Sequence, residues 1–222
     1  MPALSDLKVV DGLKLSETAR RVLRPGELVR GRDGFTRRLP RWFYQVPSWE
    51  DALEISLTPH FKLWEFIDID FREHKMLRAE KQRYVPLAVT LLAAAMEAFR
   101  VEVNTYVHIS ANGGYRSPAH ELSRYASVHC WGTAVHLYRV GDDWLDSDAS
   151  ITRYAEAARA VFPAFRALPY GTGPGKTEDH LHLDLGYVTV VPHGKGDEEP
   201  DDDAQPLPGG VAKPKQSGKK GE

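Results

Sequence analysis

Three stretches of the chain are expected to form helices. Apolar residues recur at helical spacing over residues 84–100 and predict the clearest helix. A second helix is expected from residue 150 to about residue 162, because the proline that follows cannot continue it. A shorter helix is expected within residues 57–66, where a threonine can cap the first turn and a proline can take the first helical position.

Alternating apolar and polar residues predict three strands, at residues 105–110, 134–140 and 180–187. The third strand is the most informative, because alternation separates its side chains into two sets. One face carries His180, His182 and Asp184, and the opposite face carries Leu181, Leu183 and Leu185. A strand that buries leucines on one side and presents two imidazoles and a carboxylate on the other predicts the floor of a polar cleft.

The two ends of the chain differ from this central pattern. Residues 1–40 show only brief periodicity, and we expect an irregular extension with one short helix capped by Ser16. Aromatic residues crowd residues 39–49, which favours a loop held onto the core by large rings, with a ligand-stacking platform as the alternative. After about residue 191 the chain turns to glycine, proline, aspartate and lysine, which cannot bury enough apolar surface to become ordered. The expected parts are an N-terminal extension packing on the core (1–56), a central domain (57–190) and a disordered charged tail (191–222).

The composition limits the classes of function. A chain of 222 residues with 42% hydrophobic content favours one globular domain with a tail, and we expect a monomer. The formal net charge of −2 and the pI of about 6.5 give no general attraction to nucleic acid or anionic lipid, so neither is an expected partner. The longest apolar run is too short to span a bilayer, so no membrane insertion is expected. The N-terminus lacks the pattern of a signal peptide, so we expect a protein made in the cytoplasm.

The residues that can bind a metal are histidines. A single cysteine, Cys130, excludes an intramolecular disulfide and a cysteine-based zinc finger. Catalytic zinc sites use three protein ligands and keep one position for water, and His129, His136 and His182 meet that count. His129 precedes the second strand and His136 lies on it, so we interpret the set as a zinc site between two strands and a loop.

Three motifs follow one another in a fixed order. They are Gly-Gly-Tyr-Arg-Ser-Pro-Ala-His at residues 113–120, Ser-x-His-x-x-Gly-x-Ala-x-His at 127–136 and His-Leu-Asp-Leu-Gly at 182–186. Together with the segment at 57–66, this order resembles the D-Ala-D-Ala carboxypeptidase-type zinc peptidases, which group with lysostaphin-like enzymes and hedgehog-type domains. The resemblance covers roughly residues 57–188. It implies an α+β fold with a small antiparallel sheet and flanking helices, and a zinc ion held by His, Asp and His.

Two positions depart from the family pattern. His136 stands where the family has its aspartate ligand; imidazole also binds zinc, but it removes a negative charge and leaves the metal a stronger Lewis acid. The family's general base is a glutamate three residues before the last ligand. That position is Asp179 here, with Glu178 and His180 as the alternatives.

The resemblance also implies roles for the neighbouring residues. Arg116 matches an arginine that contacts the substrate carbonyl or carboxylate and stabilises the oxyanion, with a structural ion pair at the turn as the alternative. Ser127, His180 and Asp184 would orient the ligands. Cys130 is expected to pack in the core.

The function that the resemblance implies is zinc-dependent hydrolysis of a peptide bond in bacterial cell-wall peptides that contain D-amino acids. The partner would be a peptidoglycan stem peptide or muropeptide, and the protein would reach it after lysis or injection. One alternative is a catalytically impaired relative that serves as a peptidoglycan-binding or structural module of a phage or secretion particle. Another is an iron-type oxygenase that uses His180, His182 and a carboxylate.

Overall fold

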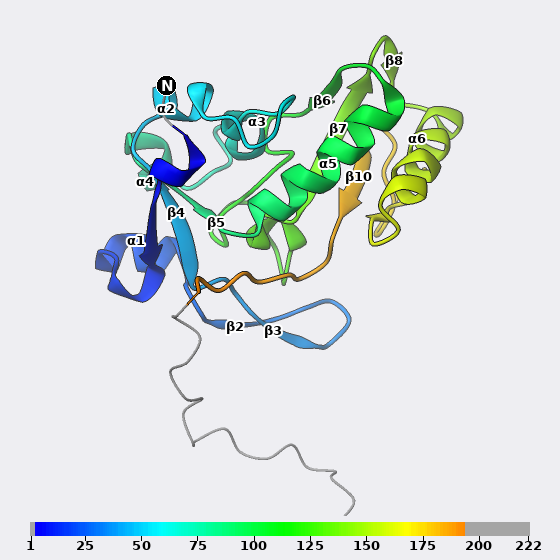
Figure 1. The fold of residues 1–222 in the computed structure, drawn as a ribbon. Helices are drawn as coiled ribbons and strands as arrows, with labels where there is room; N and C mark the ends of the chain where they lie inside the picture. Colours follow the sequence, from blue (N-terminus) through cyan, green and yellow to red (C-terminus); the bar gives the residue numbers. More distant parts are fainter. Residues whose placement is uncertain (1–2, 194–222) are drawn as a thin grey trace, which may run out of the picture. The chain divides into compact units, whose positions relative to one another are not determined.

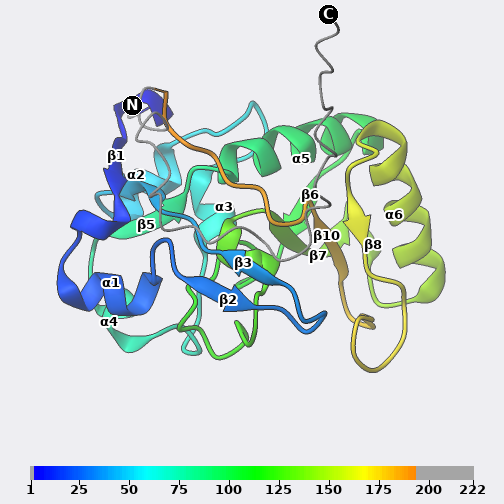
Figure 2. The ribbon, with the colours of Figure 1, turned by 90° about the horizontal axis from the view of Figure 1, so that it is seen from below.

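Three antiparallel sheets and several helices make up residues 3–193, the part of the chain that the computed structural model describes (Figures 1 and 2). The expected α+β class with small antiparallel sheets is confirmed. Met1–Val191 form one compact unit. Beyond residue 193, the predicted tail lies outside the described residues.

The largest sheet places the histidine-rich segments side by side. Its order is β6 (Val107–Ile109), β7 (Ala134–Val140), β10 (Leu181–Asp184) and β9 (Arg166–Ala167), and β8 (Asp143–Trp144) pairs with the end of β7. β7 and β10 run antiparallel, and His182 lies opposite His136 in their register. The three predicted strands are therefore confirmed, with somewhat shorter bounds for the first and the third.

Two helices pack against the leucine side of this sheet. They are α5 (Val89–Val103) and α6 (Asp148–Val161), which contact each other, and α6 also contacts β10 (Figure 1). Leu181 and Leu183 are fully buried in one core cluster with Leu92, Met96 and Phe99 of α5. Each such buried side chain stabilises the fold by about 1.5–3 kcal/mol. This burial leaves the histidine side of β10 to form the candidate site.

The first 56 residues are more regular than expected. β1 (Lys8–Asp11), β4 (Trp42–Val46) and β5 (Arg83–Pro86) form a three-stranded antiparallel sheet. α1 (Glu17–Leu23) begins after Ser16, whose Oγ accepts a hydrogen bond from the Ala19 amide at 3.2 Å, so the short predicted helix is confirmed. The expectations of an irregular extension and of a loop at residues 39–49 are wrong, because partners from distant parts of the chain stabilise these strands.

Two predicted helices begin later than expected. α3 (Leu63–Ile67) starts after a turn in which Thr58 Oγ1 accepts from the Phe61 amide at 3.2 Å. The helix predicted over 84–100 starts at Val89, because residues 83–86 pair with β4 instead.

No described helix is long and apolar enough to cross a membrane. The remaining elements are η1 (Leu4–Asp6), η2 (Gly12–Lys14), β2 (Leu28–Arg30), β3 (Thr36–Arg38), α2 (Trp49–Glu54), α4 (Lys75–Ala79) and η3 (Val128–Trp131).

Candidate metal centre

Three histidines from three different elements meet on the polar side of the largest sheet. His129 lies in η3, His136 on β7 and His182 on β10. One ring nitrogen of each lies within 4.8 Å of the others, which is close enough to hold a metal ion. The predicted cluster is thus confirmed, and residues 3–193 contain no second group of this kind. Imidazole nitrogen is a ligand for several transition metals, zinc among them.

His129 is held by the backbone of the glycine turn at residues 113–114. Its Nδ1 donates to the Gly114 carbonyl at 2.8 Å, so Nε2 carries the lone pair that can bind a metal or accept a hydrogen bond. The turn itself is tightly placed, because a Cβ on Gly114 would overlap the backbone of Phe66 at the end of α3. The Tyr115 amide also donates to the Phe66 carbonyl at 2.7 Å. Glycine at this position therefore lets α3 fix the carbonyl that orients His129.

His182 presents a nitrogen that no other described residue satisfies. Its Nε2 donates to Asp184 Oδ2 at 2.8 Å, and the other oxygen of that carboxylate accepts from the Gly186 amide at 2.8 Å. Its Nδ1 is buried and has no hydrogen-bond partner within the described part of the chain. A buried polar atom without a partner costs about 1–3 kcal/mol, and a bound metal would remove that cost. A carboxylate behind a ligand histidine also fixes the ring and raises its basicity.

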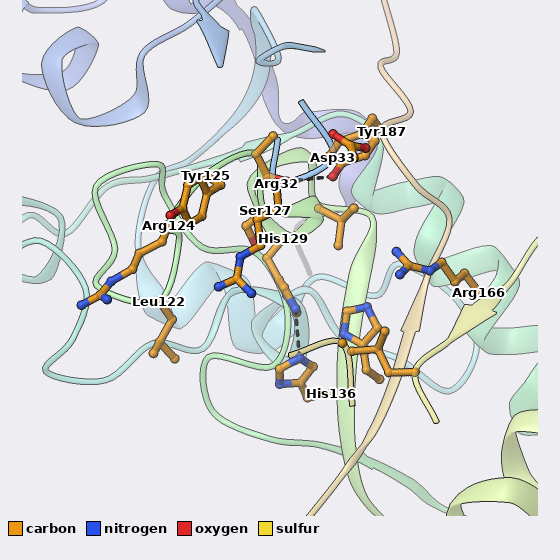
Figure 3. A pocket seen from close by; sticks show the side chains of 15 residues that line it. Arg32, Asp33, Leu122, Arg124, Tyr125, Ser127, His129, His136, Arg166 and Tyr187 are labelled. Atoms are coloured by element: carbon orange, nitrogen blue, oxygen red, sulfur yellow. Dashed lines mark hydrogen bonds between the residues drawn. The ribbon is translucent and has the colours of Figure 1, made fainter. Parts of the chain in front are cut away.

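The guanidinium of Arg116 leaves His136 with its proton on the ring nitrogen that faces His129. Arg116 is buried, and its Nη2 lies 3.2 Å from His136 Nδ1. Because a guanidinium only donates, Nδ1 of a neutral His136 accepts and the ring proton is on Nε2. That proton points to His129 Nε2, which lies 3.0 Å away (Figure 3). His136 therefore becomes a metal ligand through Nε2 only when this nitrogen gives up its proton.

Burial keeps the centre uncharged. It lowers the pKa of His129 and of His136 well below their ordinary value of 6.5. Neighbouring groups act in the same direction, since Arg116 disfavours a proton on His129 and a charged His129 disfavours one on His136. Both rings are therefore neutral at pH 7, and the neutral ring is the one that binds metals.

His180 links the predicted acidic residues to this centre. Its ring stacks on His136, with centroids 4.0 Å apart and planes inclined by 26°. Its Nδ1 is hydrogen-bonded to Asp179 Oδ1 at 2.5 Å, and burial lowers the pKa of His180 while this carboxylate opposes the shift. The Asp179 side chain is 80% exposed, and Glu178 is exposed as well. Among the three candidates for a proton acceptor, His180 is the one that contacts a ligand histidine.

A buried polar network holds Arg116 behind His136. Arg116 Nε donates to the Asn112 carbonyl, and burial lowers the pKa of Arg116 to about 10. Asn112 has a left-handed φ of 56°, and its Oδ1 accepts from the Asp70 amide at 3.1 Å and lies 2.9 Å from His120 Nε2. The sequence analysis singled out Arg116 but gave no role to the residues that hold it. The one local signal was the Asn-Gly-Gly turn, which Asn112 begins.

Ser127 and Cys130 lie on either side of His129. Ser127 lines the cavity beside the centre, and its hydroxyl makes no hydrogen bond to a ligand histidine within the described residues. Cys130 is buried, and burial raises the pKa of its thiol to about 12. The thiol therefore stays protonated and unreactive, and the expectation that Cys130 packs in the core is confirmed.

The three histidines open onto a cavity of about 390 Å³ (Figure 3). Its wall also includes Arg32, Arg124, Arg166 and Tyr187, which sequence patterns did not single out. Arg32 comes from the turn between β2 and β3, and Arg166 comes from β9. These residues lie far apart in the sequence and show no shared motif, so only the folded chain brings them together.

Comparison with known proteins adds no relative: the chain matches no protein-family model, no curated protein and no solved structure.

The three histidines of the candidate centre fit a metal ion. His129 and His182 each have one ring nitrogen fixed by a carbonyl or a carboxylate, and the other nitrogen is left for a ligand role. The buried, unpartnered Nδ1 of His182 is the nitrogen best prepared to bind a metal.

Proposed function

We propose that this protein is a zinc-dependent peptidase that hydrolyses a peptide bond in bacterial cell-wall peptides containing D-amino acids. The observation that carries the metal is the buried, unpartnered Nδ1 of His182 within a group of three histidines. Zinc is favoured because three histidine nitrogens with an open fourth position form a familiar ligand set of catalytic zinc. The peptide substrate and the D-Ala-D-Ala-peptidase-like fold rest on the motif resemblance over residues 57–188.

In this proposal each residue around the three histidines has its own role. A zinc ion there supplies the Lewis acidity that activates water and polarises the substrate carbonyl. His180 accepts a proton at Nε2, because its Nδ1 is engaged by Asp179. Asp179 orients that ring and stabilises it when it is charged. Arg116 is buried and hydrogen-bonds to His136, so we assign it to positioning His136 rather than to contact with the substrate.

Metal content tests the first half of this proposal. We expect about one zinc per chain after loading, and no retained zinc in His182→Ala. His60→Ala is the matched control, since His60 is 45% exposed and pairs with Glu97 away from the centre. A wild-type protein that stays metal-free after loading would exclude the peptidase.

Digestion of a panel of muropeptides tests the second half. Wild-type protein should release product from at least one of them. His180→Ala should keep its zinc and lose activity by about 100-fold or more, the usual contribution of a general base. Full activity in His180→Ala would move the base to Asp179 or Glu178, which Asp179→Asn and Glu178→Gln then separate.

The hydrogen bond from Arg116 to His136 favours a second candidate, a catalytically impaired module that binds cell-wall peptides in a phage or secretion particle. An Nε2 proton on His136 opposes metal binding at that ring. Zinc-loaded protein that sediments with peptidoglycan but releases no product would support this candidate over the peptidase. In both cases the protein would reach the wall after lysis or injection.

A further inference from the structure

An N-terminal hairpin forms part of the wall around the three histidines. β2 and β3 pair antiparallel, with Leu28 opposite Arg38. The turn between them carries Arg32 and Asp33, and both line the same cavity as the histidines (Figure 3). In Figure 2 the hairpin extends from the N-terminal sheet toward the side of β10. Sequence patterns gave this hairpin no part in the site.

Arg37 ties the hairpin to the segment after β10. Its guanidinium lies 3.9 Å from the centroid of the Tyr187 ring. The same guanidinium donates through its two terminal nitrogens to the Asp33 carboxylate at 2.8 and 2.5 Å. The Tyr187 hydroxyl donates to the Ala126 carbonyl at 2.8 Å. These contacts place the tip of the hairpin at the cavity.

Positive charge dominates this wall. Arg32, Arg124 and Arg166 all line the cavity, and all three side chains are exposed to it or to solvent. Asp33 is the one acidic residue in the described lining, and Arg37 neutralises it, holding the pKa of its carboxyl at about 2. The whole chain carries a net charge of −2, so the excess of positive charge is local.

Contacts within the fold leave the guanidinium groups of the three arginines available to bind a ligand. Arg32 lies over the Tyr125 ring, 5.2 Å from its centroid, which orients the guanidinium without neutralising it. Arg166 Nη1 lies 3.9 Å from Asp184, and that carboxylate already accepts hydrogen bonds from two other groups. Figure 3 shows Arg32 and Arg124 on one side of His129 and His136, and Arg166 on the other. A cleft lined by one sign of charge attracts ligands of the opposite sign.

We infer that the β2–β3 hairpin is a specificity element and that Arg32, with Arg124 and Arg166, binds carboxylate groups of the substrate. The inference rests on the proposed function for the identity of the substrate as a peptide. Guanidinium groups bind carboxylates through paired, charge-assisted hydrogen bonds. The protein therefore selects peptides that carry free carboxylates over their amidated forms.

A matched pair of peptides tests this inference. One is the acidic pentapeptide Ala-D-Glu-Lys-D-Ala-D-Ala with its carboxylates free, and the other carries D-Gln and a C-terminal amide. Calorimetry of the full chain, after zinc loading and again after chelation, should give at least about tenfold tighter binding of the acidic peptide. Higher ionic strength should reduce this preference.

Two hairpin variants show which residue causes the preference. The preference is the ratio of the affinity for the acidic peptide to the affinity for the amidated peptide. Arg32→Ala should lower this ratio about three- to tenfold. Arg30→Ala removes the same charge from the same hairpin, but Arg30 does not line this cavity, so the ratio should stay at the wild-type value. Equal binding of the two peptides by wild type, or equal losses in both variants, would overturn the inference.

The two proposals fail in different ways. Protein that takes up no zinc but still prefers the acidic peptide would refute the peptidase and keep the arginine site. Protein that takes up zinc and cleaves acidic and amidated peptides equally well would keep the peptidase and refute the arginine site.

Discussion

His136 and His182 face each other across one pair of strands, and the structure prepares them for different roles. Next to His182, the Asp184 carboxylate accepts a hydrogen bond from Nε2–H, so the lone pair of Nδ1 is left for a metal. His136 has the Arg116 guanidinium behind it, which takes up the Nδ1 lone pair and leaves a proton on Nε2. The sign of the charge behind each ring therefore decides whether that ring is ready to bind a metal.

The same comparison explains how a histidine fits at position 136, where the motif resemblance would place an aspartate. Arg116 is buried and needs acceptors for its N–H groups. An aspartate at position 136 would supply a charged acceptor, and His136 supplies a neutral one through Nδ1. Arg116 thus keeps an acceptor without the carboxylate, but the candidate centre has one negative charge fewer than with aspartate and a proton that must leave before a metal binds His136.

Removal of the carboxylate behind His182 has the largest expected effect. Asp184→Asn keeps the size of the side chain but loses the charge that fixes the His182 ring, so zinc affinity should fall about 10- to 100-fold. Competition with a chromophoric chelator measures this. Asp143→Asn, at a 49% exposed aspartate on β8, is the matched control and should bind zinc like wild type. Wild-type affinity in Asp184→Asn would remove the basis of the comparison.

Removal of the guanidinium behind His136 should act in the opposite direction. In Arg116→Met no cationic donor faces Nδ1 of His136, so its proton can move to Nδ1 when zinc binds Nε2, and zinc affinity should rise about tenfold. Arg116→Lys keeps a charged donor and should stay near wild type. A thermal melt of each variant checks that the fold survives. A weaker zinc site in Arg116→Met would mean that Arg116 supports His136 as a ligand.

Acid should destabilise the metal-free protein through the uncharged pair His129 and His136. Their pKa values lie below 6.5 in the folded chain, whereas the unfolded chain titrates near 6.5. Below pH 6.5 the unfolded state therefore binds more protons, and the free energy of unfolding falls by about 1.4 kcal/mol per pH unit for each histidine. Urea unfolding from neutral pH down to about pH 5 measures this slope. His129→Asn should make the slope shallower, and an unchanged slope would contradict the assignment.

The smallest effect is expected at Ser127. Its hydroxyl makes no hydrogen bond to the ligand histidines within residues 3–193, although the motif resemblance gave it an orienting role. Ser127→Ala should therefore change zinc affinity by about twofold or less. A tenfold loss would restore that orienting role and would place a third supporting group beside those of His136 and His182.

Local pattern was enough for the parts of this protein that depend on short-range chemistry. Alternation identified β7 and β10, the boundary residues Ser150 and Pro163 located α6 to within two residues of its start, and ligand chemistry selected His129, His136 and His182. These predictions succeeded because periodicity and ligand type are properties of neighbouring residues. The regular N-terminal strands were missed for the converse reason, since β1 and β4 are stabilised by pairing with distant segments.

The sequence by itself determined the α+β class and the three histidines. Only the tertiary structure decided which nitrogen of each ring can bind a metal, because that depends on the group that hydrogen-bonds to the other nitrogen. The glycine turn against α3 places a carbonyl behind His129, the register of β7 with β10 pairs His136 with His182, and the Asn112 turn places Arg116 behind His136. The hairpin that brings Arg32 to the cavity belongs to the same category, because its contact with Tyr187 joins opposite ends of the described chain.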